Sequence, residues 1–239
     1  MPMEPFFVAH GIEASYGRLQ VLWGVDLELR EGESAVLLGS NGAGKTTLLK
    51  ALLGLRPVLQ GEILLAGQHM EHLRTDLRVQ RGIHYMTELG VFPNLSVDEN
   101  LQVGGLGLHH HDLRQRIGNL YETFPDLGRL HGAPAASLSG GQRKMLGVAK
   151  AIVVPPRLLL MDEPSAGLSP RYVSEVVATL RGLHEDGITM LIAEQNVKFL
   201  EIADRAYVLD GGRISFAGSV VELEANDAVR QAYFGVGGH

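Results

Sequence analysis

The chain has 239 residues, of which 45% are apolar, and a formal net charge of −6, so we expect a globular protein and not a nucleic-acid binder, which needs clustered Lys and Arg. It has no cysteine, which excludes disulfides and thiolate metal sites and is compatible with a reducing cytoplasm. No run of about 18 apolar residues could span a bilayer, and the N-terminus lacks the pattern of a signal peptide, so we expect a cytoplasmic protein that reaches any membrane through a partner.

Short β-rich runs alternate with helical patterns along the chain, which is typical of an α/β layered domain. The runs near Val36, Leu159 and Leu191 are continuously apolar, as expected for central strands of a parallel sheet buried on both faces. The earlier strands alternate more, and the strand from Glu62 follows a glycine-marked turn, which predicts an antiparallel layer. The predicted strands are 6–14, 25–30, 34–39, 62–67, 82–86, 157–163, 188–194, 206–211 and 213–218.

The β signal disappears over residues 87–156, where 112–124 and 140–154 carry helical spacing. We therefore predict a helical subdomain at about 87–156, inserted into a sheet domain formed by about 1–86 and 157–239. The whole chain then forms a single domain.

The segment GSNGAGKTT follows one of the apolar strands and has the order Gly39-x4-Gly44-Lys45-Thr46. Its glycines let the backbone approach a phosphate chain, while loop N–H groups and the N-terminus of the next helix point at the anion. Lys45 would reach the β- and γ-phosphates of ATP, and the Thr46 hydroxyl would bind Mg²⁺. The alternative is a glycine-rich turn with an incidental lysine. The predicted nucleotide contacts are Gly39, Ser40, Asn41, Gly42, Ala43, Gly44, Lys45, Thr46 and Thr47.

Two acids, Asp162 and Glu163, end another apolar strand. In this fold class ligands bind at the carboxyl ends of the strands. We expect Asp162 to hold Mg²⁺, and Glu163 to orient or deprotonate the water that attacks the γ-phosphate. An isolated pair of acids would more often be a solvated turn, so this prediction depends on the phosphate loop.

The pentapeptide LSGGQ, residues 138–142, begins a helical pattern. Ser139 is a predicted N-cap, and Gly140 and Gly141 would expose helix N–H groups to a second anion. One ATP cannot use two separate glycine-rich sites unless they face each other across a dimer interface. The alternative is an ordinary capped helix start. The basic residues after Gln142 indicate a helix face, not a nucleic-acid patch.

His109, His110 and His111 precede Asp112 and raise the possibility of a metal site. Three adjacent residues cannot easily all face one ion on a helix, so a solvated loop is the favoured interpretation.

With these motifs in this order and spacing, the chain resembles ATP-binding cassette (ABC) proteins over nearly its whole length. Within that family it is most similar to the ATP-binding subunits of branched-chain amino acid uptake systems. The resemblance implies a P-loop NTPase fold with a RecA/F-type-ATPase-like parallel-sheet core, an antiparallel β subdomain and an inserted helical subdomain. It also implies ATP and Mg²⁺ as ligands. The segments that carry the narrower similarity are VFPNLSVDENL, FPDL, DEPSAGLSP, EQNVKFLEIADRAYVLDGGRI and NDAVRQAYFG.

Further roles follow from the resemblance. Tyr16 lies where the family stacks an aromatic ring on adenine, the alternative being a rim tyrosine. Glu88 stands where most members have the glutamine of the Q-loop, and Ser169 where a typical member has an aspartate. Gln195 occupies the position of the switch histidine, and its amide can donate a hydrogen bond to the γ-phosphate but cannot carry a proton.

The resemblance implies an ATPase that energises an ABC membrane transporter, most similar to an importer of branched-chain amino acids. Its partners would be integral-membrane permease subunits, a second cassette (a copy or a paralogue) and, indirectly, a solute-binding protein, at the inner face of the cell membrane. Val91, Phe92 and Leu95 lie where the family docks its permease, although an ordinary core role for Phe92 stays open. The alternative function is an ATP-dependent dimerisation switch for a soluble partner.

Overall fold

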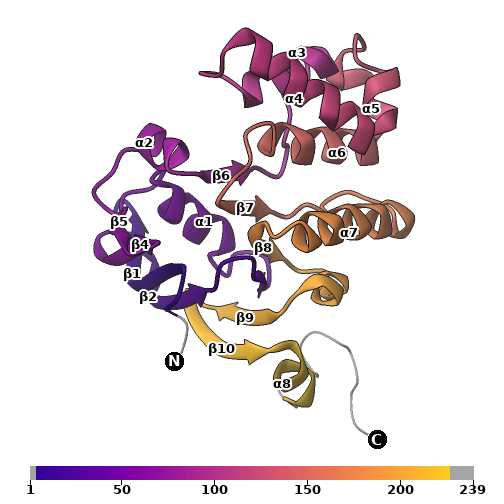
Figure 1. Ribbon diagram of the computed structural model, residues 1–239. Helices are drawn as coiled ribbons and strands as arrows, with labels where there is room; N and C mark the ends of the chain where they lie inside the picture. Colours follow the sequence, from indigo (N-terminus) through magenta and orange to yellow (C-terminus); the bar gives the residue numbers. More distant parts are fainter. Residues whose placement is uncertain (1–3, 227–239) are drawn as a thin grey trace, which may run out of the picture.

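A six-stranded sheet forms the centre of the structure, a computed structural model that describes residues 4–226 (Figure 1). Its strand order is β10-β9-β3-β8-β7-β6, and all neighbours are parallel except β9 and β10, which form an antiparallel pair. Every residue of β3, β7 and β8 is buried, which is why these strands are continuously apolar. The strands are β3 Ser34–Leu38, β6 Ile83–Met86, β7 Leu158–Asp162, β8 Thr189–Glu194, β9 Arg205–Asp210 and β10 Arg213–Ser219.

A second, antiparallel sheet has the order β2-β1-β4-β5. The sequence predicts its second strand only from Val25, whereas β2 begins at Leu19 and pairs with the end of β1 in a hairpin. Exposed apolar residues such as Leu19 and Trp23 interrupt the alternation there, which hides the strand. The strands are β1 Phe7–Tyr16, β2 Leu19–Leu29, β4 Gln60–Leu65 and β5 Gln68–His69.

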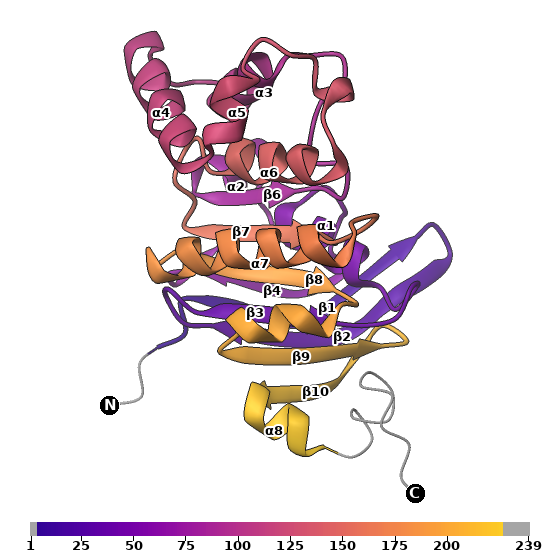
Figure 2. The same ribbon diagram turned by 90° about the vertical axis from the view of Figure 1, so that its right-hand side faces the viewer.

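The two faces of the central sheet belong to two different cores. Successive strand residues point to opposite faces, so Val36 and Leu38 contribute to one core while Ala35 and Leu37 contribute to the other. Helix α1, Lys45–Leu53, fills the core shared with the antiparallel sheet. The opposite core is covered by α7, Pro170–Glu185, and by the short helix η2, Val197–Ile202 (Figure 2). Two further short helices are α2, Thr75–Gln80, and α8, Val220–Ala225.

The remaining helices lie together beyond the edge strand β6, between β6 and β7 in the chain (Figures 1 and 2). The helix predicted over 112–124 begins two residues earlier, and the one predicted over 140–154 ends at Ala151. The subdomain limits at 87 and 156 stay predictions. The helices are α3 Val97–Gly104, α4 His110–Thr123, α5 Pro125–Arg129, η1 Ala135–Ser137 and α6 Gly140–Ala151.

The histidine cluster does not form the loop that the sequence suggests. His109 is the N-cap residue of α4, and His110 and His111 form its first turn on the surface. Within residues 4–226 no group of three or more His, Cys, Asp or Glu could hold a metal ion. None of the helices over the same residues is long and apolar enough to cross a membrane. Most of the NDAVRQAYFG segment lies outside the described residues.

Candidate active site

The glycine-rich loop connects β3 to α1 at the carboxyl edge of the central sheet. A Cβ added to Gly39 would lie 2.8 Å from the carbonyl oxygen of Leu209, so a larger residue would force the loop away from β9. Gly42 and Gly44 adopt left-handed backbone conformations with φ of 82° and 109°, and Gly44 is the N-cap residue of α1. The helix N-terminus therefore points its free N–H groups at the space enclosed by the loop.

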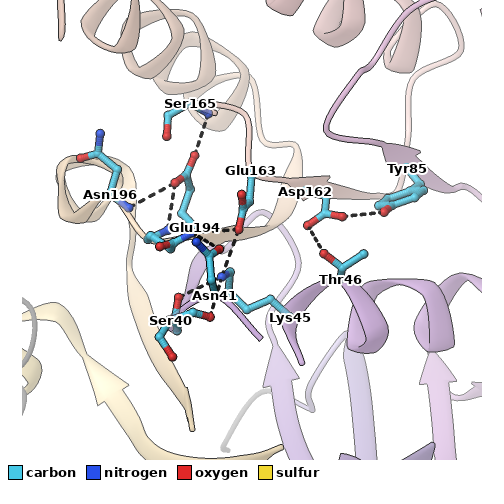
Figure 3. A network of polar contacts seen from close by, with 12 residues as sticks. Ser40, Asn41, Lys45, Thr46, Tyr85, Asp162, Glu163, Ser165, Glu194 and Asn196 are labelled. Carbon is cyan, nitrogen blue, oxygen red and sulfur yellow. Dashed lines mark hydrogen bonds and ion pairs between the residues drawn. The ribbon is translucent and has the colours of Figure 1, made fainter. Parts of the chain in front are cut away.

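Lys45 is the first residue of α1, and its side chain is only 4% exposed. Its Nζ donates hydrogen bonds to the carbonyl oxygens of Gly39 at 2.9 Å and Ser40 at 3.2 Å. It also forms an ion pair with Glu163 Oε1 at 3.1 Å (Figure 3). The ammonium therefore lies at the mouth of the loop, beside the acid that follows β7.

Thr46, Asp162 and Tyr85 form a row of oxygen atoms next to this ion pair (Figure 3). The Thr46 hydroxyl donates to Asp162 Oδ1 at 3.0 Å, and the Tyr85 hydroxyl donates to Asp162 Oδ2 at 2.9 Å. Burial, and then the Asp162 carboxylate, raises the pKa of Tyr85 far above its usual range, so it stays a donor. A hydroxyl and a carboxylate oxygen side by side fit a hard cation such as Mg²⁺.

Glu163 lies directly after β7 with φ of 47°, a conformation rare for a residue with a side chain. Its backbone N–H donates to the carbonyl oxygen of Ala193 in β8 at 2.9 Å, which holds it there. Gln195 Nε2 donates both to Glu163 Oε1 at 3.2 Å and to Asn41 Oδ1 at 2.6 Å. Such strain is typical of functional sites, and Gln195 links the glycine-rich loop to the strained acid.

Glu194 is a buried acid that the sequence analysis missed, because it ends an apolar strand without a motif of its own. Its carboxylate accepts hydrogen bonds from the backbone N–H groups of Ser165, Gln195 and Asn196, at 2.7 to 3.2 Å (Figure 3). These bonds fix the chain after Glu163 to the chain that carries Gln195. In the sequence, Glu194 could have been identified from its position at the end of a central strand, directly before Gln195.

A pocket of about 270 Å³ opens over the glycine-rich loop, the start of α1 and Glu163. It brings together the glycine-rich loop, Glu163 and Glu88, which the sequence assigned to one site. Neither Tyr16 nor the LSGGQ residues line it. The lining residues are Val21, Asn41, Gly42, Gly44, Lys45, Thr46, Thr47, Glu88 and Glu163.

Tyr16 lies at the end of β1, beside the start of α1. A hydrogen bond with Thr47, helped by the charges of Arg56 and Lys50, lowers the pKa of its hydroxyl although partial burial opposes this. The Arg56 guanidinium lies 3.9 Å from the centre of the Tyr16 ring. One ring face is therefore already covered, and adenine stacking on Tyr16 stays a prediction.

The LSGGQ segment lies at the start of α6. Ser139 is the N-cap residue, with its Oγ accepting from the N–H of Gln142 at 3.2 Å, while Gln142 Oε1 accepts from the N–H of Ser139 at 2.9 Å. This capping box occupies one lone pair of the Ser139 hydroxyl and leaves its proton free to donate elsewhere. Gly141 faces the ring of Tyr172, while Gly140 has more open space.

The fold and the site together define a P-loop nucleotide-hydrolysing cassette. A model of the ABC transporter family matches residues 22–166, more than half of the chain. The chain is 36% identical to the high-affinity branched-chain amino acid transport ATP-binding protein BraG of Pseudomonas aeruginosa, over 94% of this chain and 97% of that protein. It is 35% identical to the probable branched-chain amino acid transport ATP-binding protein LivF of Archaeoglobus fulgidus, over the same shares. The lipopolysaccharide export system ATP-binding protein LptB of Escherichia coli is 32% identical, over 95% and 96%.

Solved structures show the same fold. An ATP-binding cassette of an ABC transporter in its ADP conformation superposes with a TM-score of 0.85 and 24% identity, over 98% of this chain and 100% of that one. CbiO1 from Clostridium perfringens, part of an ABC transporter complex, gives 0.82 and 25%, over 96% and 94%. The chain belongs to the ABC transporter family. The predicted fold class is confirmed, and so is its assignment as an ATP-binding, ATP-hydrolysing protein.

Proposed function

We propose that this chain is the ATP-hydrolysing subunit of a membrane importer for branched-chain amino acids. The observation that carries the proposal is the convergence of Lys45, Thr46 and Glu163 at one pocket, with Asp162 hydrogen-bonded to Thr46 beside it. The relatives BraG and LivF, named for branched-chain amino acid transport, are more similar to the chain than LptB is. The alternative, a switch acting on a soluble partner, has no such support among these relatives.

In this proposal the glycine-rich loop and Lys45 hold the phosphates of ATP. Lys45 would turn from its loop carbonyls and Glu163 toward the β- and γ-phosphates, as a charge-assisted donor. Thr46 and Asp162 would hold Mg²⁺, which when bound supplies charge neutralisation between the phosphates. Tyr85 would orient the Asp162 carboxylate from behind, because its hydroxyl binds the second carboxylate oxygen.

Glu163 is proposed as the general base. Once Lys45 turns to the phosphates, Glu163 Oε1 loses one of its two partners and can accept the proton of the attacking water. Gln195 already donates to that oxygen and to Asn41, so its amide would orient the carboxylate and face the γ-phosphate without taking a proton. Glu88, at the rim of the same pocket, would contact the water or the Mg²⁺.

The LSGGQ residues are proposed to act on ATP held by a second cassette. Ser139, Gly140, Gly141 and Gln142 lie outside the pocket over Lys45, so one chain does not bring all of the predicted contacts to one ATP. A copy or a paralogue facing it would complete both sites, and one ATP would then lie between each Lys45 and the opposite Ser139.

The permease is proposed to dock near the start of the helical group. Phe92 is 49% exposed and Leu89 is 80% exposed, while Val91 and Leu95 are partly exposed beside them. An apolar surface of this kind on a cassette fits a membrane-subunit contact. The chain would then work at the inner face of the membrane, with the solute chosen by the permease and a solute-binding protein.

The proposal is tested by uptake of radiolabelled leucine, isoleucine and valine into cells that lack this chain, complemented with the wild type or with Glu163→Gln. We expect uptake with the wild type only, at matched protein levels, because general-base loss slows hydrolysis about 10²- to 10⁴-fold. Labelled proline and urea serve as solute controls. Normal branched-chain uptake without the chain, or with the variant, would contradict the proposal.

A further inference from the structure

We propose that Lys144 is a positioning residue that ties the placement of α6 to the setting of Glu163. The inference rests on the proposed function, because it assigns Glu163 the role of general base. The sequence predicts only a helix face for the basic residues after Gln142, and Lys144 does lie on α6. Its side chain is 7% exposed and points into the interior between α6 and the central sheet.

The Lys144 ammonium binds two backbone carbonyl oxygens that belong to different parts of the site. Nζ donates to the carbonyl oxygen of Glu88, in the loop after β6, and to that of Glu163, after β7, at 3.0 Å. Both carbonyls lie just past the carboxyl ends of neighbouring strands. One side chain therefore joins the helix that begins with LSGGQ to both loops.

Burial and the nearby carboxylates act on the Lys144 charge in opposite directions. Burial lowers the pKa of Lys144, and the carboxylates of Glu88, Glu194, Glu163 and Asp162 oppose that shift, in this order of effect. No aliphatic residue could replace both the charge and the two hydrogen bonds, because the two carbonyl oxygens would then lose this donor.

The backbone of Glu163 shows why this contact bears on the base. Its N–H is fixed by Ala193 of β8 and its carbonyl by Lys144 of α6, while φ is held at 47°. The direction of the carboxylate therefore depends on two elements, one in the sheet and one in the helical group. A displacement of α6 against the sheet would pull on the carbonyl and turn the carboxylate away from Lys45 and Gln195.

The kinetic consequence is a loss of rate without a loss of binding. Lys144→Met keeps the length of the side chain and removes its donors, and Lys144 does not line the ATP pocket. Because misplacing a reacting group by about 1 Å costs up to about 100-fold in rate, we expect kcat for ATP to fall by about 10- to 100-fold. The KM and the Kd of ATP should stay within about 2-fold of the wild type, because Lys144 does not contact the ATP pocket and its loss should affect the transition state more than the bound ground state.

Lys150→Met is the matched control. Lys150 lies on the same helix and burial also lowers its pKa, but its ammonium lies over the Phe92 ring, 4.6 Å from the ring centre, and no hydrogen bond from it to the site is found among the described residues. We expect its ATPase rate in the full-length chain to equal that of the wild type. Lys144→Arg, which restores charge and donors, should recover most of the rate. If Lys144→Met does not fold, Lys144→Gln, which is shorter and uncharged, replaces it and should show the same loss of kcat, and a normal kcat in that variant would overturn the inference.

The decisive comparison adds Lys144→Met to Glu163→Gln. If Lys144 acts through Glu163, the second change should lower the residual rate of Glu163→Gln by less than about 2-fold. Multiplicative losses, a normal kcat for Lys144→Met, or an equal loss in Lys150→Met would overturn the inference. A wild-type rate in Glu163→Gln would instead overturn the proposed base, which keeps the two failures distinct.

Discussion

The Lys45 ammonium contacts two carbonyls of its own loop and the carboxylate of Glu163, so we expect its removal to act on ATP binding and on the proposed base together. Lys45→Ala deletes a charge-assisted contact to the phosphates, of a kind that contributes about 1.5–3 kcal/mol. We expect ATP affinity to fall by about 10- to 100-fold, because 1.4 kcal/mol corresponds to a factor of ten. Titration calorimetry with ATP in excess Mg²⁺ measures this directly.

Lys198→Ala is a suitable control for that experiment, since the Lys198 ammonium donates to the Ser174 hydroxyl and Lys198 does not line the ATP pocket. Its ATP affinity and ATPase rate should match those of the wild type. An unchanged affinity and turnover in Lys45→Ala would remove the phosphate-binding role from the glycine-rich loop.

Single residues of the site were predictable where a local pattern marks them. Asp162 ends a continuously apolar strand, and Thr46 lies in the first turn of the helix after the glycine-rich loop. The structure puts their side-chain oxygen atoms 3.0 Å apart. Tyr85 and Glu194 carry no such pattern, because their contacts depend on the register of β6 with β7 and on the loop after β8. The contacts of Lys144 were not predicted for the same reason, since its carbonyl partners lie far away in sequence.

At the scale of elements, the start of α6 depends on how closely α7 approaches it. A Cβ added to Gly141 would lie 2.3 Å from a ring carbon of Tyr172, whereas one added to Gly140 would lie 3.4 Å from Leu168. Gly141→Ala should therefore lower the free energy of unfolding by about 1–3 kcal/mol, the usual cost of overpacking. Urea denaturation of the full-length chain measures the difference.

Gly140→Ala is the matched control, because both glycines lie in the first turn of α6 and gain the same helix propensity from alanine. It should leave the free energy of unfolding unchanged or raise it by up to about 1 kcal/mol. Equal effects of the two substitutions would mean that the contact between α6 and Tyr172 does not set the position of the helix start.

The elements that the sequence predicted best are those buried on both faces. Strands β3, β7 and β8 stand out as continuous apolar runs because the sheet is covered by α1 on one side and α7 on the other. The first half of β2 and the two-residue β5 are largely exposed and carry no such run. Helix α3 was missed as well, although Ser96 and Glu99 form a capping box at its start, because it is only eight residues long.

At the scale of the whole molecule, the two predicted anion-binding features, the glycine-rich loop and the LSGGQ segment, do not share one pocket. Lys45 lies over a pocket at the carboxyl edge of the central sheet, while Ser139 begins α6 outside that pocket. A cassette that uses both must therefore meet a second one, and ATP itself would complete the interface. The association should then depend on ATP that stays intact.

Glu163→Gln tests this dependence. Glutamine keeps an oxygen that can accept from Lys45 Nζ and Gln195 Nε2, as Glu163 Oε1 does, but it cannot take the proton of water. Binding should survive while hydrolysis slows about 10²- to 10⁴-fold, so unhydrolysed ATP should hold two cassettes together. Sedimentation velocity of the variant, alone and with the candidate second cassette, should show a dimer with Mg-ATP and monomers without it.

Adding Lys45→Ala to Glu163→Gln gives the control for that dimer. The double variant holds ATP weakly because it lacks the phosphate contact, so it should sediment as a monomer even with Mg-ATP. Replacing Mg-ATP by Mg-ADP should likewise give monomers, since ADP has no γ-phosphate for the opposite Ser139 to reach. The contrary result is a Glu163→Gln chain that hydrolyses ATP slowly and binds it tightly, yet stays monomeric both alone and with the candidate second cassette. That result would leave Glu163 as the proposed base and contradict the two-cassette site. The LSGGQ segment would then be an ordinary capped start of α6.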